Sequence, residues 1–132
     1  MNSSLRNKSE FLVDSAMLLH DNNLYPAVAH CSYYACFQLL MHIWKHKMEK
    51  TENDLDILRR SLDRGMHEVL LSEVVSYIKN RSLKDFRINT EIAELKRIRV
   101  KADYKDADVV DADSQKAIRL SQTIIPLLKR YC

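Results

Sequence analysis

Arg99, Asp103 and Tyr104 are the side chains in this sequence whose types and spacing best suit chemistry. Arg99 follows Leu95 by four residues and Ile92 by seven, so it projects from the apolar face of a predicted helix. Asp103 lies four residues further on, within reach of the guanidinium. A charge on a buried face is costly unless it is paired. The spacing therefore predicts either a structural ion pair or a site for an anion such as phosphate.

Two further basic residues extend this candidate site. Arg97 is turned by about 200° from Leu95 and is expected in solvent. Guanidinium and ammonium groups pair well with phosphate oxygens, so Arg99, with Arg97 and Lys101 near it in sequence, is suited to a phosphate. The five N–H donors of Arg99 exceed what one carboxylate can accept. We therefore expect Arg99 and Tyr104 to face a groove shared by two subunits, flanked by Arg97 and Lys101.

Other polar clusters in the sequence suit solvent better than a ligand. His42 and His46, with Glu49 beyond, have the spacing of half a metal site, but no second ligand pair accompanies them and they share a stripe with lysines. The aspartates between Asp106 and Asp113 lack the glycine and closing glutamate of a calcium loop. We expect no metal and no cofactor.

The elements that must position Arg99 are predicted to be helices around one central segment. Pro26–Lys47 is apolar over a length that exceeds a strand, which predicts a helix covered by its own bundle on one side and by a partner chain on the other. Further helices are expected over Ser4–His20, after Thr51, over Met66–Lys79, from between Ser82 and Thr90 to Tyr104, and after Asp111 or Asp113. On the first helix, Phe11 and Leu18 are expected to widen the inward face.

Length and composition fit one all-α domain spanning residues 1–132. The chain has one glycine and two prolines, and a net charge of +3 that does not suggest a dedicated nucleic-acid binder. Its three cysteines are odd in number, and two lie in the predicted core helix, which favours a reducing compartment. The first residues lack the layout of a signal peptide, and no apolar run suits a membrane span. We expect a cytoplasmic protein that does not contact a membrane.

Three segments together resemble HEPN domains. They are the small-and-tyrosine run 29–37, the helix start Gly65-Met66-His67, and the closing Arg-x-x-Ala-Asp-Tyr of Arg99–Tyr104. The resemblance covers roughly residues 12 to 131. It implies an up-and-down four-helix bundle with an additional short helix, usually a homodimer whose groove lies where two copies of the fourth helix meet.

The same resemblance implies a function on RNA or nucleotides. Many HEPN domains are ribonucleases, and many form the toxin of a toxin–antitoxin pair with a small nucleotidyltransferase. The resemblance would make Arg99, Asp103 and Tyr104 catalytic, and Arg97, Arg99 and Lys101 the residues that bind phosphate or RNA. In related toxins a tyrosine near this position accepts a nucleotide from the partner. A dimeric protein-interaction module without catalysis is the alternative.

One part of the HEPN motif is missing from this chain. The motif places four to six residues between its arginine and its histidine, whereas the residues that follow Arg97 and Arg99 after four intervening positions are Ala102 and Tyr104, and no histidine follows His67. Cleavage through the 2′-hydroxyl of RNA needs a base of near-neutral pKa, while tyrosine titrates near 10. The sequence therefore predicts weakened or absent ribonuclease activity.

Overall fold

Every regular element of the computed structural model is helical in residues 3–81 and 87–132, the part of the chain that the structure describes. This confirms the all-α prediction. The elements in chain order are α1 (Ser4–Asp21), α2 (Tyr25–His42), a π-helical turn η1 (Ile43–Lys47), α3 (Glu52–Leu62), α4 (Met66–Lys79), α5 (Arg87–Tyr104) and α6 (Asp111–Lys129).

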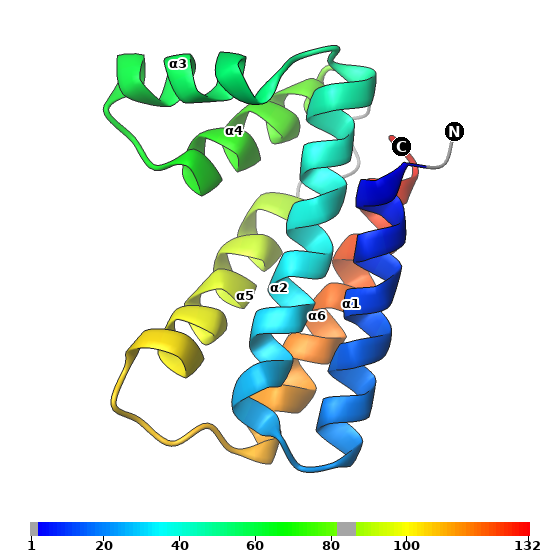
Figure 1. The fold of residues 1–132 in the computed structure, drawn as a ribbon, viewed down its shortest axis with the longest axis vertical. Coiled ribbons are helices and arrows are strands. Elements are labelled where there is room, and N and C mark those ends of the chain that lie inside the picture. Colours follow the sequence, from blue (N-terminus) through cyan, green and yellow to red (C-terminus); the bar gives the residue numbers. More distant parts are fainter. Residues whose placement is uncertain (1–2, 82–86) are drawn as a thin grey trace.

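α2 is the centre of the fold, as its apolar sequence predicts. α1, α5 and α6 pack around it, and α1, α2, α5 and α6 alternate in direction (Figure 1). The side chains of Leu39 and Ile43 are fully buried. Ala35 is also fully buried, and its carbonyl accepts a hydrogen bond of 2.7 Å from Ser9 Oγ of α1. At Ala35, α2 is therefore covered by the protein's own first helix.

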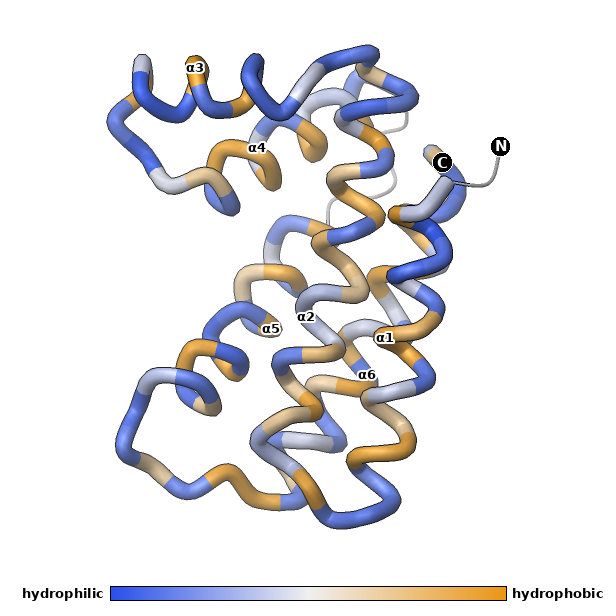
Figure 2. The backbone as a smooth tube through the Cα atoms, viewed as in Figure 1, coloured by the Kyte–Doolittle hydropathy of each residue, from blue (hydrophilic) through white to orange (hydrophobic). Residues whose placement is uncertain are grey.

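α3 and α4 form a pair of helices that lies across one end of this four-helix arrangement (Figure 1). α3 is mostly hydrophilic (Figure 2) and buries only Leu55 completely. Two helices, and not the one short helix predicted, therefore lie outside the bundle. Their positions place α4 beside the first half of α5, where the two helices border a cleft described below.

The start of α3 is fixed by the capping that the sequence predicts. The Thr51 hydroxyl accepts a hydrogen bond from the Asp54 N–H, and the Asp54 carboxylate accepts one from the Thr51 N–H. The indole N–H of buried Trp44, in the π-helical turn, donates to the Thr51 carbonyl at 2.8 Å. Asp63 ends α3 in the left-handed conformation, with φ of 51°, whereas Gly65 begins α4 with an ordinary φ of −71°.

Three details differ from the sequence-based expectations. Phe11 and Leu18 are 72% and 65% exposed, because α1 packs only through the face that carries Ala16, Leu12 and Leu19, and this face does not extend to them. His42 is buried and not solvated, because Ser3 at the start of α1 reaches it, with Ser3 Oγ 2.6 Å from its Nδ1. The N-cap of α6 is Val110; Asp113 instead accepts the Val110 N–H through its carboxylate.

Candidate functional site

Arg99 lies on the buried face of α5, as predicted, and is 7% exposed. Three tyrosine rings surround its guanidinium. Its Cζ lies 4.9 Å from the ring centre of Tyr33, 5.4 Å from that of Tyr34 and 5.5 Å from that of Tyr104. α2 supplies the first two rings and the last residue of α5 supplies the third. Ring faces stabilise a cation that has been removed from water, which explains how the fold tolerates this charge.

The polar partners of Arg99 do not use all its donors. Nη1 donates to the Tyr34 hydroxyl at 3.2 Å and lies 3.7 Å from Oδ2 of Asp103, an ion pair too long for a hydrogen bond. Nε is buried and has no hydrogen-bond partner in the described residues. The guanidinium thus retains capacity to bind an anion.

Asp103 also contacts a histidine that the sequence did not connect with the site. Its Oδ2 lies 3.0 Å from Nδ1 of His30, on α2. The Asp103 side chain is 22% exposed and that of His30 is 50% exposed. Asp103 is therefore partly exposed, and it has a second polar partner besides Arg99.

His67 is the functional candidate that the sequence left out of the site. Its Nδ1 lies 2.7 Å from the Tyr33 hydroxyl, and its ring stacks on that of Phe37 at 4.4 Å. The Tyr33 ring thus contacts both His67 and Arg99. Arg99 and His67 lie on different helices, so no local motif could have paired them; the Gly65-Met66-His67 helix start was the only signal.

Burial and neighbouring cations set the proton affinities of this pair. Burial, followed by the charges of Arg99 and Lys96, lowers the pKa of His67 below its usual range. Burial raises the pKa of Tyr33 to about 12, although Arg99 acts in the opposite direction. Near neutral pH the pair therefore holds a neutral imidazole against a neutral phenol.

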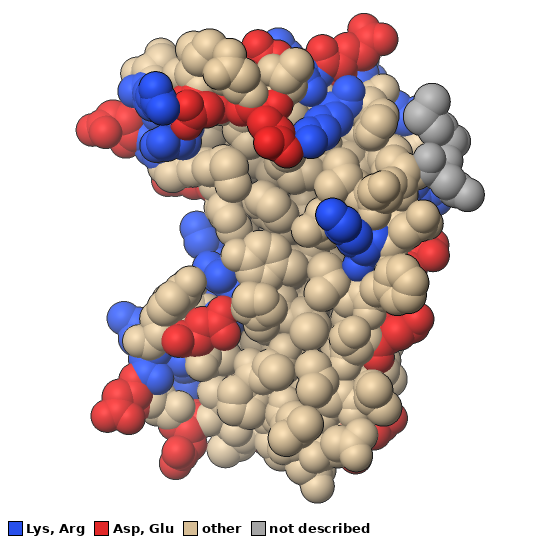
Figure 3. Space-filling view, in the orientation of Figure 1, with Lys and Arg blue, Asp and Glu red and all other residues tan. Residues whose placement is uncertain are grey.

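Tyr33 and His67 border a cleft of about 430 Å³ between α4 and α5. The space-filling view shows the molecule hollowed here, with Lys and Arg side chains at the wall (Figure 3). The remaining residues of the lining are Arg64, Glu68, Leu71, Ser72, Val75, Ser76, Lys79, Asn89, Ala93 and Lys96. Such a volume suits a small ligand or one or two nucleotides.

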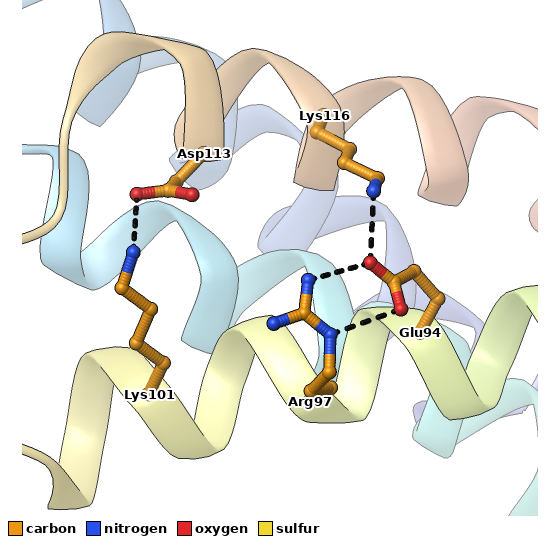
Figure 4. Close-up of polar contacts among 5 residues, drawn as sticks. All are labelled: Glu94, Arg97, Lys101, Asp113 and Lys116. Carbon is orange, nitrogen blue, oxygen red and sulfur yellow. Dashed lines mark hydrogen bonds and ion pairs between the residues drawn. The ribbon is translucent and has the colours of Figure 1, made fainter.

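Arg97 and Lys101 do not join Arg99; both point towards α6 (Figure 4). Arg97 binds both carboxylate oxygens of Glu94, at 2.7 and 3.0 Å, and Lys116 of α6 lies 2.8 Å from the same carboxylate. Hydrogen bonds from these two cations lower the pKa of Glu94 to about 2. Lys101 contacts Asp113 of α6 at 3.0 Å. These pairs connect α5 to α6, so the predicted set of three phosphate-binding residues is divided between two sides of α5.

A second groove follows the outer side of α5. Its volume is about 420 Å³, and four of its residues are basic. The lining consists of Ala93, Lys96, Arg97, Val100, Lys101 and Lys105. Ala93 and Lys96 line this groove and the α4–α5 cleft, so the two depressions adjoin along α5.

The described residues contain no group of three or more His, Cys, Asp or Glu side chains able to hold a metal ion. His42 and His46 do lie together, with ring centres 4.8 Å apart, but His42 is buried against Ser3. Cys31, Cys36 and Cys132 are free thiols. None of the helices in the described ranges is long and apolar enough to cross a membrane.

Comparison with protein-family models, with curated proteins and with solved structures finds no match to this chain.

Proposed function

We propose that this protein is a HEPN-like domain that binds phosphate groups of RNA or nucleotides, as one component of a toxin–antitoxin or nucleotidyltransferase-partnered system. In this proposal it acts in the cytoplasm as a homodimer. The motif site on α5 has weak ribonuclease activity or none, because the motif histidine is absent from that helix. The three-segment resemblance supports the family, and the geometry around Arg99 supports phosphate binding.

The observation that carries the proposal is the incomplete pairing of Arg99. A purely structural arginine would be expected to direct several N–H groups at carboxylates or carbonyls. Here one hydroxyl and one distant carboxylate serve the guanidinium, and Nε is unpartnered among the described residues. A phosphate oxygen is the ligand that this geometry suits best, because it accepts charge-assisted hydrogen bonds from the same donors.

Tyr104 lies between Arg99 and the solvent on one side of the guanidinium. The Tyr104 side chain is 70% exposed although its ring stands over the guanidinium. An incoming phosphate would therefore displace a ring that has little packing to lose. The free phenol is also where the resemblance would place an accepted nucleotide.

RNA-binding titrations of the Arg99→Ala variant test the proposal. We expect wild-type protein to bind single-stranded RNA with salt-dependent affinity, and Arg99→Ala to bind at least about tenfold more weakly, as one charge-assisted contact is lost. Arg119→Ala removes an exposed arginine from α6 and serves as the matched control. Circular dichroism of both variants shows whether each is folded.

Equal RNA affinity of folded Arg99→Ala and wild type would refute a role for this residue in phosphate binding. Wild-type protein that binds neither RNA nor nucleotides would refute the proposed function. A large loss of stability in Arg99→Ala, without RNA binding by the wild type, would assign the arginine to the fold alone.

Exposed apolar residues on α1 favour a second candidate function, a dimeric protein-interaction module. Phe11 and Leu18 are seven residues apart and both exposed, so they share one outward face. We propose that a second copy of the chain covers this face. Light scattering should then show a dimer that Phe11→Ser converts to monomer; a wild-type monomer would contradict it.

A further inference from the structure

The histidine that α5 lacks is available from α4. His67 lies at the α4–α5 cleft, hydrogen-bonded to Tyr33, whose ring in turn packs on Arg99. We propose that His67 is the catalytic base of an RNA-cleaving site in this cleft. This inference rests on the proposed function for one point, that RNA is the ligand. The choice of His67 and of the α4–α5 cleft comes from the packing of α4 against α2 and α5.

The contact with Tyr33 gives the imidazole a defined orientation. When Nδ1 carries the hydrogen, it donates to the Tyr33 hydroxyl oxygen, and Nε2 is left as an acceptor. The Phe37 ring stacks on the imidazole, with ring centres 4.4 Å apart, and limits its rotation. A base held by an orienting group is the arrangement that general-base catalysis requires.

The cleft also offers groups that suit a phosphodiester. Lys96 lies where the cleft meets the outer groove, and it forms no ion pair with a carboxylate of the described residues. Ser72, Ser76 and Asn89 add hydroxyl and amide donors to the same lining. An RNA strand following α5 would thus pass from the outer groove, past Lys96, to His67.

The reaction that these groups can support is an internal transesterification. The RNA 2′-hydroxyl transfers its proton to Nε2 of His67 while its oxygen forms a bond to phosphorus. The bond from phosphorus to the 5′ oxygen breaks, and that oxygen takes a proton from water. The products are a 2′,3′-cyclic phosphate and a 5′-hydroxyl, and His67 returns its proton to solvent. No metal, oxidant or further reactant is needed.

The charges around His67 determine its pH dependence. Tyr33 and Tyr34 face it from α2, Lys96 and Arg99 lie on α5, and the paired Arg64 and Glu68 border the cleft at α4. The cations and burial lower the pKa of His67, so the neutral, proton-accepting form is present at neutral pH. Cleavage should rise with pH to a plateau, with a midpoint below the usual histidine value of about 6.5.

His67→Ala with added imidazole is the decisive experiment. Full-length variant and wild type are incubated with mixed-sequence single-stranded RNA in the presence of a chelator, and 2′,3′-cyclic phosphate ends are counted. We expect His67→Ala to cleave about 10² to 10⁴ times more slowly, the range of a lost general base, while it binds RNA as before. Free imidazole should restore part of the rate, which a merely structural histidine would not allow. Exposed His46→Ala is the matched control, and Tyr33→Phe should shift the midpoint of the pH profile.

Three results would overturn the proposal. They are a wild type that binds RNA but does not cleave it, cleavage that persists in His67→Ala, and a loss of cleavage that imidazole does not restore in folded His67→Ala. In each of them RNA binding that depends on Arg99 would leave the proposed function intact. Absence of RNA binding by the wild type would remove both.

Discussion

Asp103 lies closer to His30 than to the arginine it was expected to neutralise. The distance from its Oδ2 is 3.0 Å to His30 Nδ1 and 3.7 Å to Arg99 Nη1. The carboxylate therefore lies at the edge of the Arg99 site, shared between α2 and α5. It balances the guanidinium only in part, and it would repel a phosphate that approaches Arg99.

Asp103→Asn should strengthen RNA binding. Removing one negative charge about 4 Å from a phosphate relieves about 1 kcal/mol of repulsion at the dielectric constant of water, so the affinity should rise about fivefold at low salt. The free energy of unfolding should change by no more than about 1 kcal/mol, because the pair is partly exposed. Filter-binding titrations measure the first quantity and urea unfolding the second. Asp106→Asn, in the connector before α6, is the control; weaker binding by Asp103→Asn would contradict the expectation.

Glu94→Gln should increase the basic character of the outer groove. Glu94 holds Arg97 through two hydrogen bonds and also contacts Lys116. Without the carboxylate charge, both cations become available to phosphates, so RNA affinity should increase and fall more steeply with salt. The slope of log affinity against log salt checks this. Glu10→Gln on α1 changes the net charge equally and is the control. If it raises the RNA affinity and the salt dependence as much as Glu94→Gln does, the outer groove is not the binding surface.

His42 should make the fold sensitive to mild acid. Burial, with the charges of His46 and Arg6, lowers its pKa to about 4. The unfolded chain, where histidine titrates near 6.5, therefore binds more protons between these values, and the free energy of unfolding must decrease as the pH falls from about 6.5 to 4. The loss attributable to this residue is at most about 3 kcal/mol.

Urea unfolding at several pH values measures that loss. His42→Gln should be less stable than wild type at pH 7 and should show a flatter pH dependence between about 6.5 and 4. His30→Gln, which alters a half-exposed imidazole, is the control. Parallel profiles of His42→Gln and wild type would show that His42 titrates normally in the folded protein.

The helices were predictable from sequence because their signals are local. The apolar length of the Pro26–Lys47 segment and the capping pattern at Thr51 depend on residues within a few positions of one another. Periodicity likewise placed Arg99 on the buried face of α5. These predictions needed no knowledge of how the helices pack.

The remaining features depend on packing between distant segments. His67 reaches the site only because α4 lies beside α2, with Tyr33 34 residues away in sequence. His42 is buried because Ser3, 39 residues earlier, covers it. Phe11 and Leu18 border the apolar face of α1, and only the limited width of its contact with the neighbouring helices leaves them exposed. Side-chain type and spacing along one helix do not predict contacts between segments that are distant in sequence.

Two residues of the turn between α3 and α4 would stabilise the domain more if their positions were exchanged. Asp63 adopts the left-handed conformation that a residue without Cβ takes most readily, while Gly65 has an ordinary φ and its added Cβ would meet no atom within 4 Å. Gly65 also occupies the N-cap of α4, where a carboxylate serves well. Exchanging the two, as Asp63→Gly with Gly65→Asp, keeps composition and net charge and should stabilise the domain by about 1 kcal/mol. A protein of the same composition, with these two residues exchanged, would thus have a higher free energy of unfolding.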